Sequence, residues 1–60
     1  MRIRTILLVD DEEMSRKYFR RIFRAGFEVI LASDGQEGLD TFRERREEIG
    51  VVVDDLKTLI

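Results

Sequence analysis

The sequence contains no cysteine, no histidine, no proline and no tryptophan among its 60 residues. Without cysteine the chain can form neither a disulfide nor a thiolate zinc site, and this absence suits a reducing compartment. Without histidine it lacks the commonest general base and the commonest metal ligand of proteins. Any metal ion must therefore bind to carboxylate and carbonyl oxygens, which favours a hard ion such as Mg²⁺.

Long apolar runs and a charge excess are absent as well. The longest apolar runs are ILLV at residues 6–9 and VILA at residues 29–32, whereas a membrane-spanning helix needs roughly 20 apolar residues. The N-terminus has no apolar segment and cleavage site of the kind that marks a signal peptide. Eleven basic and 13 acidic residues leave a net charge of −2, which does not favour nucleic acid or an anionic membrane as a partner. We expect a cytoplasmic protein that binds neither through this segment.

Hydrophobic patterning predicts strands that alternate with helices. The β-branched and leucine-rich run at 5–9 predicts a strand covered on both faces, and the runs at 28–32 and 51–53 predict two more strands. Apolar residues at three- and four-residue spacing predict a helix over residues 13–25 and a second helix from Asp34 to about residue 48. The resulting order, β-α-β-α-β, is typical of a parallel sheet with right-handed crossovers, and the predicted fold class is α/β.

Local signals mark the ends and the inner face of these helices. Asp34 as N-cap with Glu37 fits a capping box, and Gly26 is a plausible stop for the first helix. Gly38 costs its helix roughly 1 kcal/mol relative to alanine, so we expect it to serve close packing against the sheet. The residues predicted to lie in the core are Phe19, Ile22, Phe23, Leu39 and Phe42.

Four segments, in order along nearly the whole chain, resemble the response-regulator receivers of two-component signalling. ILLVDDE at residues 6–12 looks like their first strand and acidic pair, and GFEV at residues 26–29 looks like the start of their second strand. ASDGQEGL at residues 32–39 is similar to their A-x-D-G-x-E-A-L segment, with Gly38 in the place of the alanine. VVVDDL at residues 51–56 looks like the strand that ends in the phosphorylated aspartate.

The resemblance implies a flavodoxin-like receiver fragment, βαβαβ, with a three-stranded parallel sheet in the order 2-1-3. Residues 1–60 would then form a partial receiver that lacks the fourth and fifth strand-helix units. KTLI at residues 57–60 departs from the Met-Pro turn of the family, and the threonine or serine and the lysine of its later strands have no counterpart. We therefore expect this receiver to be truncated and its phosphotransfer to be impaired.

The resemblance also implies an acidic pocket that binds Mg²⁺. Its phosphoacceptor would be Asp55, with Asp54 as the second choice, because a strand that ends in Asp55 keeps Gly50 at its start rather than in its interior. The implied metal ligands are Asp10, Asp11, Asp55 and the backbone carbonyl of Lys57, with Asp11 bound directly. These groups would meet at the carboxyl ends of neighbouring strands, a rule of open parallel sheets of which receivers are themselves an example.

In that role Asp55 would be a nucleophile that accepts a phosphoryl group from a histidine kinase or a histidine phosphotransfer domain. The chain would thus be a phosphoacceptor signalling domain and not an enzyme in its own right. We expect weak Mg²⁺ binding and poor phosphorylation, since the later strands have no counterpart.

Plainer interpretations compete with this one. Asp10 and Asp11 also suit the N-terminus of a helix without any metal, and Asp54 and Asp55 also suit a solvated strand end. The basic residues of the first predicted helix fit a solvated face, or, by the family resemblance, a partner-docking helix. An alternative of another class is a half-domain without phosphotransfer that forms a homodimer through the open edge of its third strand.

Overall fold

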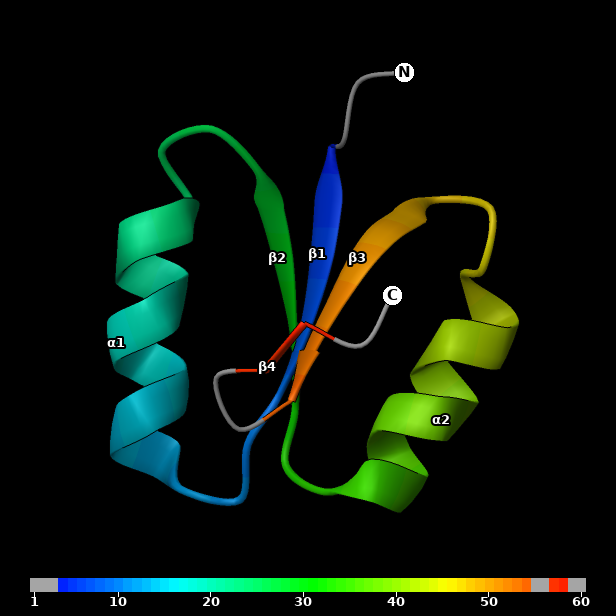
Figure 1. Ribbon diagram of the computed structural model, residues 1–60, viewed down its shortest axis with the longest axis horizontal. Helices are drawn as coiled ribbons and strands as arrows, with labels where there is room; N and C mark the ends of the chain where they lie inside the picture. Colours follow the sequence, from blue (N-terminus) through cyan, green and yellow to red (C-terminus); the bar gives the residue numbers. More distant parts are fainter. Residues whose placement is uncertain (1–3, 55–56, 59–60) are drawn as a thin grey trace.

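Three parallel strands form the centre of the fold in the computed structural model, which describes residues 4–54 and 57–58 (Figure 1). They are β1 (Thr5–Val9), β2 (Glu28–Ala32) and β3 (Ile49–Asp54). β1 lies in the middle and pairs in parallel with both neighbours, so that the strand order is β2-β1-β3. This confirms the predicted α/β class, the βαβαβ element order and the 2-1-3 sheet, an arrangement consistent with a flavodoxin-like fragment.

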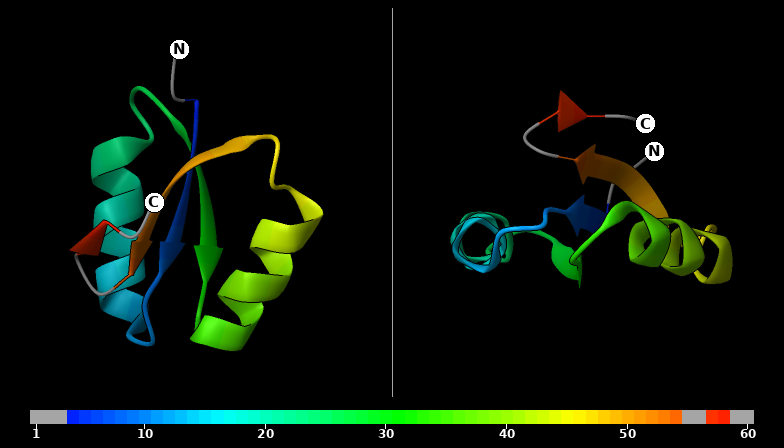
Figure 2. Two further views of the ribbon diagram at one scale, coloured as in Figure 1. Left: turned by 45° about the vertical axis from the view of Figure 1, so that its right-hand side comes forward. Right: turned by 90° about the horizontal axis from the view of Figure 1, so that it is seen from below.

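Two helices lie on opposite sides of this sheet, α1 (Glu13–Phe23) and α2 (Gly35–Glu44) (Figures 1 and 2). The start of α2 follows the predicted cap: the Asp34 carboxylate accepts a hydrogen bond of 2.8 Å from the backbone N–H of Glu37. The Glu37 carboxylate accepts in turn from the backbone N–H of Ser33, one residue before the cap. One donor that the helix itself leaves unpaired, the N–H of Glu37, is thus satisfied, together with the N–H of Ser33 just outside the helix.

Both helices are shorter than the periodicity predicts. α1 ends at Phe23, whose carbonyl accepts from the backbone N–H groups of Gly26 (3.1 Å) and Phe27 (3.0 Å). α2 ends at Glu44 rather than near residue 48, and the N–H of Glu48 donates to the carbonyl of Arg45 at 2.9 Å. For α2 the reason is topological, because the chain has to turn after Glu44 to begin β3, and β3 starts two residues earlier than predicted.

The core is built on β1, all five residues of which are buried. Leu7 and Leu8 are each only 1% exposed although they point to opposite faces, as expected of a strand covered on both sides. The cluster on the α2 side consists of Leu7, Val9, Ala32, Ile49 and Val52, with Ile30 and Phe42 packed against it. Gly38 of α2 is buried directly over Val9, and a Cβ added there would lie 2.7 Å from Val9 Cγ2. The prediction that Gly38 serves close packing is confirmed.

The predicted core residues of the helices are only partly buried. Phe42 packs against the cluster, but Phe19 and Phe23 are half-buried, and no residue of α1 is fully buried. Ile22 (48% exposed) and Leu39 (44% exposed) are on the surface, so the prediction was wrong for both. The apolar arc of each helix is wider than the part of it that rests on the sheet.

The end of the chain adds an unexpected fourth strand. β4 (Lys57–Thr58) pairs antiparallel with the last two residues of β3, Val53 with Thr58 and Asp54 with Lys57. The predicted open edge of the third strand is therefore covered at Val53 and Asp54. Among the described residues, no strand pairs with residues 49–52 on the side away from β1. Seen from below, β3 and β4 project beyond the level at which the helices flank β1 and β2 (Figure 2).

Candidate functional site

Acidic residues gather where β1 and β3 end. Asp10 follows directly on β1 and is followed by Asp11, while Asp54 is the last residue of β3. Val9 and Asp54 are partners in the parallel register. The structure thus brings Asp10, Asp11 and Asp54 to the same edge of the sheet, the carboxyl edge at which open parallel sheets bind their ligands.

Asp10 is held firmly at this edge. It is only 6% exposed, and its backbone N–H donates to the carbonyl of Ala32 at 3.1 Å, which extends the pairing of β1 with β2 by one residue. Its carboxylate Oδ1 accepts from the backbone N–H of Glu12 at 2.9 Å. A short side chain that accepts from the residue two positions on closes a turn. Asp10 therefore shapes the connection from β1 to α1.

Arg16 braces the same connection, a role that the sequence did not reveal. Its Nη1 donates a hydrogen bond of 2.8 Å to the backbone carbonyl of Asp10, and the side chain is half-buried. From the sequence alone, the basic residues of this helix, Arg16 among them, fit a solvated face. The only sequence signal was its distance of six residues from Asp10, which brings it back over the loop after about one turn of helix.

The other predicted ligands occupy less constrained positions. Asp11 is exposed, so its carboxylate is accessible to solvent and to ions. Asp55, the favoured phosphoacceptor and a predicted metal ligand, lies outside the described residues. Lys57, whose carbonyl was the fourth predicted ligand, belongs to β4 and is the register partner of Asp54. Metal binding by these residues stays a prediction.

Asp54 and Asp10 turn to opposite faces of the sheet. Residues that are register partners in neighbouring strands point to the same face, so Asp54 shares the α2 face with Val9. There it lines an apolar cleft of about 200 Å³ beneath α2, together with Leu39 and Phe42. Asp10 comes one residue after Val9 and turns toward the start of α1, where it accepts from Glu12.

The chemistry of the donors suits Mg²⁺, although the described part of the chain does not complete a site. Among residues 4–54 and 57–58, no group of three acidic side chains is placed so that it could hold a metal ion. Mg²⁺ is commonly bound through one or two carboxylates and several waters, and of the acidic pair the carboxylate of Asp11 is the exposed one.

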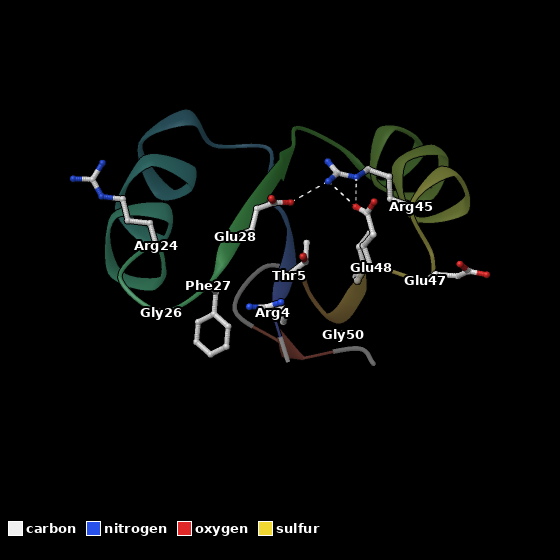
Figure 3. Close-up of a pocket in the computed structure, with 11 residues that line it drawn as sticks. Arg4, Thr5, Arg24, Gly26, Phe27, Glu28, Arg45, Glu47, Glu48 and Gly50 are labelled. Carbon is white, nitrogen blue, oxygen red and sulfur yellow. Dashed lines mark hydrogen bonds and ion pairs between the residues drawn. The ribbon is translucent and has the colours of Figure 1, made fainter. Parts of the chain in front are cut away.

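A larger cavity of about 1,210 Å³ lies at the opposite, amino-terminal end of the strands (Figure 3). Arg45 dominates its charges: it forms ion pairs with Glu48 at 2.6 Å and with Glu28 at 3.0 Å. The hydrogen bond that Arg45 donates to the Glu48 carboxylate is the main reason why the pKa of Arg45 is raised. These ion pairs tie the start of β2 to the turn before β3, and the surroundings carry both signs of charge. We assign this cavity a structural role.

The fold and the acidic edge together define a flavodoxin-like α/β segment with two carboxylates at the end of its central strand. Over 47 residues the chain is 36% identical to the polar-differentiation response regulator DivK of Brucella anthropi. The match covers 77% of this chain and 38% of that protein, so the chain spans well under half the length of this curated relative. The similarity supports a fragment of a response-regulator receiver.

Two further comparisons found nothing: no family model and no solved structure matches the chain. In the part of the chain that the structure describes, neither helix has the length and apolar character that crossing a membrane requires.

Proposed function

We propose that this chain is a receiver segment of two-component signalling that accepts a phosphoryl group on Asp55 in a reaction that depends on Mg²⁺. The observation that carries the proposal is the meeting of Asp10 and Asp11 with the end of β3 at one edge of the sheet. The similarity to a response regulator supports the same role. The donor of the phosphoryl group would be a phosphohistidine of a histidine kinase or of a histidine phosphotransfer domain.

Asp11 and Asp10 have different tasks in this proposal. Asp11 is exposed and would bind the metal directly, whereas Asp10 is buried and would orient the loop through its hydrogen bond to Glu12. Arg16 donates a hydrogen bond to the carbonyl of Asp10 and would keep this loop in place when the negatively charged phosphoryl group approaches. When bound, Mg²⁺ would neutralise the negative charge of the phosphoryl oxygens.

The face of the sheet toward which Asp54 points favours Asp55 as the nucleophile. Asp54 is turned to the apolar cleft under α2, away from the side toward which Asp10 turns. A carboxylate among apolar side chains is poorly placed to share an ion with the acidic pair. In the proposed step, a carboxylate oxygen of Asp55 attacks the phosphorus, the phosphorus–nitrogen bond breaks, and the imidazole leaves with a proton.

A labelling experiment tests the proposal without a cognate kinase. The 60-residue chain is incubated with phosphoramidate, with and without Mg²⁺, and its intact mass is followed. We expect the mass gain of one phosphoryl group only with Mg²⁺, retained in Asp54→Asn, lost in Asp55→Asn and strongly reduced in Asp11→Asn. Retention in Asp55→Asn with loss in Asp54→Asn would move the acceptor to Asp54. Absence of any label in the folded parent chain would refute phosphotransfer.

A further inference from the structure

The short connection from β2 to α2 contains two neighbouring residues that can react with each other (Figure 1). Asp34 is followed by Gly35, and it is the only aspartate in the sequence with a glycine after it. In such a pair the backbone nitrogen of the glycine can attack the carboxyl carbon of the aspartate, because glycine has no Cβ to crowd the approach. Both residues are exposed, and a Cβ built on Gly35 would meet nothing within 4 Å. The pair is therefore open to water.

We propose that Asp34 and Gly35 form a site of spontaneous isomerisation, and that the first turn of α2 controls the reaction. In the first step the nitrogen of Gly35 bonds to Cγ of Asp34, the bond from Cγ to one carboxyl oxygen breaks, and this oxygen leaves as water with the amide proton and the carboxyl proton. The product is a cyclic imide. Water then adds to one of its two carbonyls and reopens the ring, either to the original aspartate or to an isoaspartate, whose main chain runs through Cβ and Cγ. This inference is independent of the proposed phosphotransfer.

Two hydrogen bonds from α2 hold the reacting groups in the folded chain. The carboxylate of Asp34 accepts from the backbone N–H of Glu37 at 2.8 Å. The carbonyl of Asp34 accepts from the backbone N–H of Gly38 at 2.9 Å, and because this carbonyl shares a planar peptide unit with the nitrogen of Gly35, that nitrogen is held as well. Asp34 is extended, with ψ of 174°, which turns the nitrogen out of the plane that the ring would occupy. Ring closure thus requires rotations that break both hydrogen bonds.

The packing of α2 on the sheet keeps these donors in place. Gly38 is buried over Val9, so its N–H cannot move away from Asp34 without disturbing the core. The reaction therefore waits for a local opening of the first turn of α2. Because two hydrogen bonds of ordinary strength have to break, we expect the folded chain to isomerise about tenfold more slowly than the unfolded chain.

The isoaspartate product cannot cap α2 as Asp34 does. Its main chain is longer by one CH₂ group, and its free carboxylate is attached to Cα, so the carboxylate no longer lies at the N-cap position opposite the N–H of Glu37. Loss of the cap should lower the Tm of the modified chain by about 4–8 °C. An opening of the first turn that leads to reaction is thus recorded as a lasting change in α2.

Asp40 is an internal control within the same helix. It is exposed like Asp34, and its carboxylate accepts a hydrogen bond of 3.0 Å from the side chain of Gln36. The next residue is Thr41, whose branched side chain crowds the backbone nitrogen. This nitrogen also lies in the interior of α2, where backbone N–H groups are bonded to the preceding turn. We therefore expect no isoaspartate at residue 40.

Ageing of the 60-residue chain tests the proposal. The chain is kept at neutral pH and physiological temperature, folded in buffer or unfolded in concentrated urea, and isoaspartate is quantified at each aspartate by peptide mass spectrometry with electron-transfer fragmentation. We expect isoaspartate at residue 34 in urea and about tenfold slower formation in buffer.

Gly35→Ala is the matched variant, because it keeps Asp34 and its cap while the added methyl group crowds the attacking nitrogen. It should accumulate almost no isoaspartate in either condition, and its Tm should not fall during ageing, whereas the Tm of the aged parent chain should. Equal rates for the parent chain in buffer and in urea would overturn the control by α2. No isoaspartate at residue 34 in urea, or as much at residue 40 as at residue 34, would overturn the site itself.

Discussion

The contact of Gly38 with Val9 makes a quantitative prediction about stability. Replacing glycine by alanine inside a helix normally stabilises a protein by about 1 kcal/mol. Here the new methyl group would lie 2.7 Å from Val9 Cγ2. Val9 is buried, and its branched side chain has few alternative rotamers, so it cannot move aside freely.

The two effects oppose each other, and their sizes set the expected result. Overpacking of a tight core costs about 1–3 kcal/mol, so Gly38→Ala should be neutral or destabilise the chain by up to about 2 kcal/mol. In a Val9→Ala background the clashing methyl groups are absent, and the same substitution should stabilise by about 1 kcal/mol. A double-mutant cycle of the parent chain, the two single variants and the double variant should therefore give a coupling energy of about 1–3 kcal/mol between positions 9 and 38.

Urea and thermal unfolding followed by circular dichroism measure all four chains of the cycle, and 1 kcal/mol corresponds to a shift of about 4–8 °C in Tm for so small a domain. Gly35→Ala is the matched control, because it lies in the same helix and a Cβ there meets nothing within 4 Å. If Gly38→Ala stabilised the chain equally with valine and with alanine at position 9, the packing argument would be wrong.

Two more predictions follow from the hydrogen bonds at the helix starts. Asp34→Ala removes the cap of α2 and should cost about 1 kcal/mol in urea unfolding; the matched change Asp40→Ala on the exposed surface of α2 should cost clearly less, and equal losses would argue against the cap. Arg16→Gln removes the donor to the carbonyl of Asp10 and should destabilise the chain by about 1–2 kcal/mol. Arg20→Gln, on the exposed side of α1, should have little effect in the same thermal scan, and an identical loss in both variants would refute the bracing role of Arg16.

The sequence predicted the features that depend on local chemistry. The strand β1 follows from an uninterrupted apolar run, the start of α2 from Asp34 and Glu37, and the packing role of Gly38 from the cost of glycine in a helix. These signals lie within a few residues of the feature that they specify. The meeting of Asp10 with the end of β3 required only the parallel topology in addition.

The features that the sequence did not predict depend on contacts between distant segments. Periodicity shows that α1 and α2 are amphipathic but not how much of each apolar arc rests on the sheet, so Ile22 and Leu39 were misplaced. The early end of α2 depends on where β3 has to begin. The role of Arg16 depends on the path of the loop at Asp10. The strand β4 depends on pairing with β3, and a segment of two residues is too short to show a strand pattern in the sequence.

Val9 gives the acidic edge a mechanical link to α2. This single side chain touches Gly38 on the helix, precedes Asp10 in the chain and is the register partner of Asp54. A displacement of α2 by a fraction of an ångström would press on Val9 and shift the ends of both strands together. A bulkier residue at position 38 would thus act at a distance on the spacing of the carboxylates, even where the fold tolerates it.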